Sequence, residues 1–150
     1  MSQLVERAKD LAQRAHAGQT DKAGRPYIEH VARVAAAVSD DPEAEAVAWL
    51  HDVIEDCDDE FRREILSCFP ERIYRSCCTL DRNRSSCNAE YYAVVRTNEI
   101  ALRVKLADIA DNSSDERLSL LDGATAARLR RKYTNALRAL HAARTYKHGR

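Results

Sequence analysis

The sequence predicts an all-α fold, a bundle of about eight helices, from its turn residues, its composition and its hydrophobic periodicity. The 150 residues include only 4 glycines and 3 prolines, too few turn residues for a many-stranded β fold. Hydrophobic residues make up 45% of the chain and charged residues 32%, a balance typical of one compact domain. Apolar residues recur every three or four positions through most of the chain, which is the period of an amphipathic helix. We therefore expect residues 1–150 to form a single helical domain.

The first four expected helices are delimited by turn and capping residues. Gly18 ends the first helix, and a polar loop over residues 19–26 separates it from the second. Asp41 is the N-cap of the third helix and Pro42 is its first residue. Pro70 follows the fourth helix. The apolar residues between these breaks predict helices over about residues 3–17, 27–38, 42–56 and 61–69.

The second half of the chain carries four further helical patterns. They cover about residues 71–80, 91–95, 100–112 and 124–146. A polar loop over residues 81–87 separates the first two, and residues 113–123 form an irregular or partly helical connection. The last helix places Leu129, Leu137 and Leu140 on one face and basic residues opposite, as a helix with one face in the core does.

Charge and targeting signals limit the classes of partner. The 24 basic residues balance 24 acidic ones, so the chain has no overall positive field to hold a nucleic acid. The first residues, including Glu6, Arg7 and Lys9, lack the apolar core of a signal peptide, and no apolar run is long enough to cross a membrane. We therefore expect a cytoplasmic protein with no nucleic-acid or membrane partner. The 5 cysteines contain no C-x-x-C pair, which favours reduced packing residues over a zinc site.

The expected third helix carries a histidine and three carboxylates on one side. At about 100° per residue, His51, Asp52, Glu55 and Asp56 fall together, and the apolar residues fall opposite. Taken alone, these residues are better explained as a solvated acidic helix end with a chance histidine. His30 on the second helix and Asp108 on the seventh widen the set to three helices.

Asp108 interrupts an apolar pattern, and a buried carboxylate needs a partner. A salt bridge or a helix cap would serve Asp108 taken alone, and a divalent metal would serve the whole set. Two imidazoles and two carboxylates make a mixed nitrogen and oxygen site, suited to manganese, iron or zinc rather than calcium.

Three blocks of sequence resemble the HD-type hydrolase domain of RelA/SpoT homologues. They are residues 18–30 (GQTDKAGRPYIEH), 51–56 (HDVIED) and 104–112 (VKLADIADN), in the order and spacing of that family. The resemblance covers about residues 5–140, and the chain looks like the single-domain members, the small alarmone hydrolases. It implies an HD-domain helical bundle and a metal-dependent hydrolase that converts guanosine tetraphosphate or pentaphosphate (ppGpp or pppGpp) to GDP or GTP and pyrophosphate. Because the chain leaves no room for a synthetase domain, hydrolysis alone is expected, as a brake on alarmone levels or as the neutralising partner of a toxic synthetase.

The resemblance also implies roles for residues at matching positions. The implied metal ligands are His30, His51, Asp52 and Asp108. They would bind one Mn²⁺, with Zn²⁺ or Fe²⁺ as alternatives. Glu55 and Asp56 would orient and deprotonate the attacking water. The implied substrate contacts are Lys22, Lys105, Asn112 and Tyr133. For all of these except Asn112, an exposed ion pair, a solvated lysine or a core aromatic explains the residue equally well.

One departure from the family pattern bears on the substrate. The loop pair is Asp21-Lys22, where longer members carry an Arg-Lys pair whose arginine stacks on guanine. A phosphatase of the same fold acting on another phosphorylated nucleotide, such as NADPH, is therefore a second hypothesis. A non-catalytic module that senses nucleotides is a third, although the complete set of ligands argues against it. The oligomeric state stays open.

Overall fold

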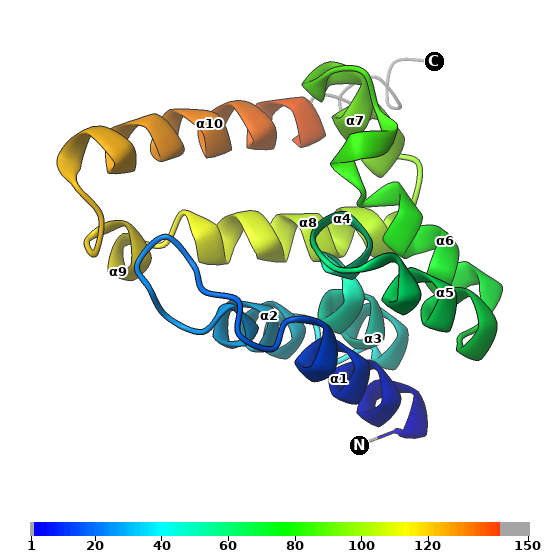
Figure 1. Ribbon diagram of the computed structural model, residues 1–150. Helices are drawn as coiled ribbons and strands as arrows, with labels where there is room; N and C mark the ends of the chain where they lie inside the picture. The colour runs from blue at the N-terminus through cyan, green and yellow to red at the C-terminus, as the bar shows by residue number, and fades with distance from the viewer. Residues whose placement is uncertain (1, 142–150) are drawn as a thin grey trace, which may run out of the picture.

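Residues 2–141 are described in the computed structural model, and they form helices joined by loops, with no β-strand among them (Figure 1). In chain order they are α1 (Gln3–Ala15), α2 (Tyr27–Ala37), α3 (Pro42–Leu50), α4 (Val53–Asp56), α5 (Asp59–Cys68), α6 (Glu71–Thr79), the 3₁₀ turn η1 (Arg82–Arg84), α7 (Asn88–Val95), α8 (Glu99–Asn112), α9 (Asp115–Leu118) and α10 (Gly123–His141). Helices α4 and α9 are single turns of 4 residues. The predicted all-α class is confirmed. Residues 142–146 of the expected last helix lie outside the described residues.

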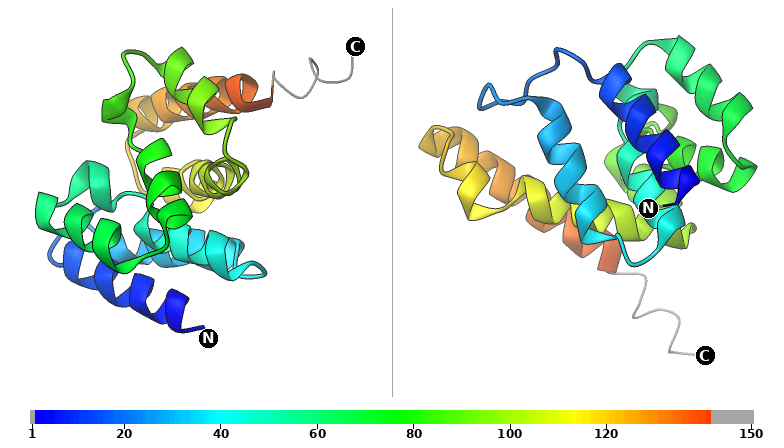
Figure 2. Two further views of the ribbon diagram at one scale, coloured as in Figure 1. Left: turned by 90° about the vertical axis from the view of Figure 1, so that its right-hand side faces the viewer. Right: turned by 90° about the horizontal axis from the view of Figure 1, so that it is seen from below.

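Helix α8 occupies the middle of the molecule. Helices α1, α2 and α3 lie on one side of it and α10 on the other, as Figure 1 and the left view of Figure 2 show; α8 packs on α2, α3 and α10. The largest fully buried side chains are aliphatic and come from six helices: Leu11, Leu50, Ile65, Ile73, Ile109 and Leu118. Because α8 is packed on two sides, a polar residue in its middle is removed from water.

Most helix boundaries follow the predicted signals. The Asp41 side chain accepts a hydrogen bond from the Glu43 amide, which makes Asp41 the N-cap of α3 as expected. Gly18 follows α1 with a φ of +81°, a left-handed conformation that glycine adopts without strain. Gly24 has a φ of +80° in the same loop, which the Asp21 carboxylate closes by accepting from the Ala23 and Arg25 amides. The loop is thereby a defined structure beside α9 (Figure 1).

The prediction of one continuous third helix over residues 42–56 is wrong. Helix α3 ends at Leu50, and α4 begins at Val53 after a turn formed by His51 and Asp52. The cause is local, because the His51 ring Nδ1 donates to the Ala48 carbonyl over 2.6 Å and takes an acceptor that a continuing helix would use. The turn, rather than one helical face, therefore sets the directions of His51 and Asp52.

The cysteines divide into two groups. Cys77 and Cys78 are buried on α6, as expected of packing residues, and Cys57 is half-buried. Cys68 and Cys87 are exposed, so for these two the predicted packing role is wrong. All five are unpaired. Within residues 2–141 no helix is both long and apolar enough to cross a membrane.

Candidate metal centre

Two histidines and two aspartates from distant parts of the chain meet beside α8. His30 comes from α2, His51 and Asp52 from the turn before α4, and Asp108 from the middle of α8. One ligand atom from each lies within 4.8 Å of the other three. Atoms on opposite sides of a single transition-metal ion lie about 4 Å apart, so the cluster has nearly the size of a one-ion site. The exposed fractions of His30, His51 and Asp108 are only 1%, 3% and 4%.

Each histidine is oriented by its other ring nitrogen. His51 Nδ1 donates to the Ala48 carbonyl, and His30 Nδ1 lies 2.6 Å from Asp111 Oδ2. Histidines that bind metals usually donate the second ring N–H to a carbonyl or carboxylate in this way. Both rings therefore present Nε2 to Asp108, at 2.9 Å from His30 and 3.3 Å from His51.

One buried nitrogen of the cluster lacks a hydrogen bond. His51 Nε2 lies 2.9 Å from Asp52 Oδ2 and 3.3 Å from Asp108 Oδ1, but the angles allow a hydrogen bond to neither. A buried polar atom without a partner is costly, and a metal ion would supply that partner. The four residues therefore fit a divalent metal site by their donor types, their spacing and this unsatisfied nitrogen.

The two aspartates are held as carboxylates. Burial alone would raise the pKa of Asp108, but the Lys105 ammonium and the two histidines outweigh it and lower the pKa well below its usual range. Asp108 accepts from Lys105 Nζ at 2.9 Å and from Asn112 Nδ2 at 3.0 Å. The Tyr27 hydroxyl donates to Asp52 Oδ2 over 2.5 Å. Both carboxylates are thus anchored in the ionised form that binds a metal.

The two acids on α4, Glu55 and Asp56, have raised pKa values, whereas those of Asp52 and Asp108 are lowered. Burial, together with the charges of Asp56 and Asp52, raises the pKa of Glu55 to about 7. Asp56 is more exposed, but partial desolvation and the charge of Asp52 raise its pKa to about 6. A carboxylate that titrates near neutral pH suits general acid and base chemistry. Glu55 lines the same cavity as Asp52 and Asp108, whereas Asp56 lines neither of the cavities described below.

Two cavities adjoin the cluster and share three residues, Tyr27, Asn112 and Tyr133. The smaller, of about 220 Å³, contains Asp52, Glu55 and Asp108 and has three cationic side chains on its wall: Arg82, Lys105 and Lys132. The larger, of about 620 Å³, lies between the loop after α1, α9 and α10, and Lys22, Arg117 and Leu118 are among its lining residues. All four implied substrate contacts therefore line one cavity or both, although the Lys105 ammonium also binds Asp108.

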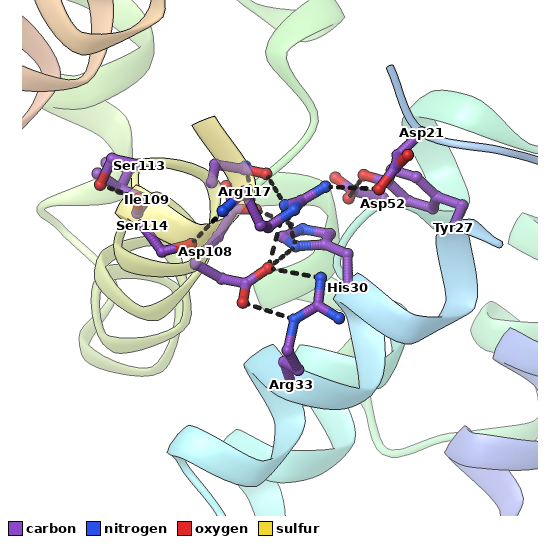
Figure 3. A network of polar contacts seen from close by, with 12 residues as sticks. Asp21, Tyr27, His30, Arg33, Asp52, Asp108, Ile109, Ser113, Ser114 and Arg117 are labelled. Carbon is purple, nitrogen blue, oxygen red and sulfur yellow. Dashed lines mark hydrogen bonds and ion pairs between the residues drawn. The ribbon is translucent and has the colours of Figure 1, made fainter. Parts of the chain in front are cut away.

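Several residues of this region were missed by sequence reasoning. Tyr27 and Asp111 lie inside the blocks that carry the resemblance, and Asp111 follows Asp108 by almost one helical turn, a spacing that could have found it. Arg82, Arg117 and Lys132 lie in segments whose pattern predicts a loop or a solvated helix face, so no local signal marks them. Figure 3 shows that Arg117 lies between Asp21 and His30.

Comparison with known proteins supports the fold. No protein-family model matches the chain. The solved structure of a protein described as a metazoan ortholog of SpoT that hydrolyses ppGpp superposes with a TM-score of 0.64, covering 92% of this chain and 96% of that one at 23% identity. The chain has the fold of that SpoT ortholog. The predicted HD-type helical bundle is therefore confirmed.

A second comparison concerns a short stretch of sequence. A guanosine-3′,5′-bis(diphosphate) 3′-pyrophosphohydrolase of Vibrio cholerae serotype O1 is 53% identical over 51 residues. The match covers 32% of this chain and only 7% of the Vibrio protein. The predicted resemblance thus holds as a likeness of fold to the SpoT ortholog over nearly the whole chain, and as a likeness of sequence over about a third of it.

Proposed function

We propose that the protein is a metal-dependent phosphohydrolase that removes the 3′-diphosphate of ppGpp or pppGpp. Water cleaves the ester bond between the ribose 3′ oxygen and phosphorus, which leaves GDP or GTP and releases pyrophosphate. The observation that carries the proposal is the buried cluster of His30, His51, Asp52 and Asp108, which opens into a cavity that Glu55 also lines. The fold shared with a protein described as hydrolysing ppGpp supports this choice of substrate.

The residues have two roles, metal binding and proton transfer. His30, His51, Asp52 and Asp108 would hold the ion, for which we propose Mn²⁺, with Zn²⁺ or Fe²⁺ as alternatives of similar ligand preference. When bound, such an ion polarises a phosphoryl oxygen and lowers the pKa of water from about 15.7 towards 7. Glu55 takes the proton of the attacking water, and its pKa of about 7, raised by burial and then by the charges of Asp56, next to it on α4, and Asp52, suits that task.

The cavities supply the contacts for a compact polyanion. The net charge of the chain is zero, but Arg82, Lys105 and Lys132 converge on the smaller cavity. The pKa of Lys132 is lowered by partial burial and then by the positive charges of Lys105 and Lys22. A bound phosphate group would relieve this repulsion between cations. Lys22, Asn112 and Tyr133 would contact the nucleoside in the larger cavity.

Product analysis tests the proposal. The purified protein is incubated with Mn²⁺ and ppGpp, and nucleotides and phosphates are separated by anion-exchange chromatography. We expect GDP and pyrophosphate in equal amounts, with no product when EDTA replaces the metal. Absence of product at micromolar enzyme, or release of single phosphate, would show that the proposed reaction is wrong.

A phosphatase acting on another phosphorylated nucleotide, such as NADPH, is the second candidate. Asp21 favours this candidate. Its carboxylate accepts a hydrogen bond from Arg117, and position 21 therefore has no arginine side chain that could stack on a guanine base. A panel of nucleotides assayed for phosphate and for pyrophosphate separates the two reactions.

A further inference from the structure

We propose that Asp111 and Arg117 are positioning residues: Asp111 fixes the ring of His30 so that Nε2 faces the cluster, and Arg117 ties Asp111 to the loop after α1. The inference rests on the metal-binding part of the proposed function and needs nothing from the choice of nucleotide. The Asp111 carboxylate lies on the last turn of α8.

Asp111 is held by two arginines and one histidine. Arg33 Nε lies 2.8 Å from Oδ1, and Arg117 Nη1 lies 3.0 Å from Oδ2, the oxygen that also contacts His30 Nδ1 at 2.6 Å. A carboxylate between two guanidinium groups keeps its charge and can only accept hydrogen bonds. The proton in the short contact with His30 therefore belongs to Nδ1, and Nε2 is the atom left to face Asp108 and Asp52.

Arg117 extends this arrangement to the wall of the larger cavity. Its Nη1 donates to Asn112 Oδ1 over 2.6 Å, and its Nη2 donates to Asp21 Oδ2 over 3.1 Å. Arg117 Nη1 also lies 3.1 Å from His30 Nδ1. Both nitrogens are donors, and they lie close together because both donate to the same oxygen, Asp111 Oδ2. One guanidinium thus joins α9, the end of α8 and the loop (Figure 3).

The contacts of Asp21 give a structural reason for an acid at position 21 of the loop after α1. Oδ1 of Asp21 closes the loop on itself through two amides, and Oδ2 receives Arg117, so both oxygens are in use. The acid at position 21 and the arginine at position 117 form one ion pair across the cavity, with side-chain exposures of 9% and 20%. Asp21 therefore acts as an anchor for the loop.

The first experiment measures metal affinity, because the second partner of a metal-bound histidine typically contributes about 10-fold to 100-fold. Mn²⁺ binding to the full chain is followed by the electron paramagnetic resonance signal of the free ion, without nucleotide. Asp111→Ala removes the acceptor, and we expect an affinity about 10-fold to 100-fold weaker. Asp111→Asn keeps a neutral acceptor and should restore part of the loss. The control is Asp115→Ala, four residues further on, where the side chain is 96% exposed.

The second experiment observes the ring itself. In the Zn²⁺-loaded protein, ¹⁵N NMR of the imidazoles should show a proton on His30 Nδ1 and the metal on Nε2. This measurement uses the unaltered chain and so decides the question even if Asp111→Ala fails to fold. Arg117→Met should weaken Mn²⁺ binding less than Asp111→Ala does and should raise KM for the nucleotide more than it lowers kcat, because it releases the loop.

The outcomes separate this inference from the proposed function. A folded Asp111→Ala variant that binds Mn²⁺ within twofold of the parent, or a His30 ring bound through Nδ1, would overturn the positioning role. Tight Mn²⁺ binding with the expected loss in Asp111→Ala but no turnover of ppGpp would overturn the proposed function and leave this inference standing.

Discussion

Replacing Glu55 with glutamine should slow hydrolysis strongly and at the same time stabilise the metal-free protein. Glu55 has an ordinary pKa of 4.5 when unfolded and a pKa of about 7 in the folded chain, through burial and the charges of Asp56 and Asp52. The folded state therefore binds more protons than the unfolded state between these two values. The free energy of unfolding falls as the pH rises from 4.5 to 7, and it stays low above pH 7.

The size of the effect follows from the shift. One pKa unit corresponds to about 1.4 kcal/mol, so the ionised Glu55 costs at most about 3 kcal/mol at pH 8. Water reaching the cavity and relaxation of the side chains reduce this to about 1 kcal/mol. For a chain of this length that is a rise in Tm of about 3 °C for Glu55→Gln at pH 8, with no change at pH 4. Loss of the general base lowers kcat by about 10²-fold to 10⁴-fold.

Thermal unfolding in EDTA at both pH values measures the first effect, and the ppGpp assay measures the second. Glu60→Gln is the matched control, since Glu60 is an exposed acid on the neighbouring helix α5. A Glu55→Gln variant that is no more stable than the parent at pH 8 would show that the ionised Glu55 carboxylate does not destabilise the folded state. Unchanged turnover in the same variant would remove Glu55 from the proposed reaction.

Three further predictions address the ligands, the loop and the cavity. His51→Ala should abolish Mn²⁺ binding, and metal analysis that finds one ion retained per chain would contradict the ligand assignment. Gly18→Ala should lower the free energy of unfolding by about 1 kcal/mol, because φ is +81° at this position. Gly123→Ala, at the start of α10, should leave the free energy of unfolding unchanged. Urea denaturation that finds the two variants equally stable would contradict this prediction. Lys132→Gln should raise KM for ppGpp by about twofold to fivefold with little change in kcat. Steady-state kinetics checks this, and a KM equal to that of the parent would place Lys132 outside the site.

Local signals predicted the helices well because they act within a few residues. Asp41 caps α3 and Gly18 ends α1 through hydrogen bonds and backbone preferences that neighbouring residues determine. The break after Leu50 escaped prediction because apolar periodicity continues through it, and a single side chain, His51, takes the carbonyl that the helix needs. A pattern of residue types contains no information about that competition.

The candidate site shows the same division. The four implied ligands could be named because they lie in three short blocks of sequence with family-like spacing, and the structure brings their ligand atoms together. Arg117 and Asp21 are 96 positions apart, and only the fold places them in contact. Lys105 lies in the middle of α8, three residues before Asp108, but this spacing alone does not assign it to Asp108, because a lysine on a helix usually faces water.

The spacing of the candidate ligands along the chain has a consequence for handling the protein. His30 and Asp108 are 78 positions apart, so an ion held between them would act as a reversible cross-link between α2 and α8 that the unfolded chain cannot form. At a free metal concentration of about 100 times Kd, such a cross-link adds about 2.7 kcal/mol to the free energy of unfolding. Samples from different purifications would then melt at different temperatures according to their metal content. A melting curve would serve as an assay of metal loading.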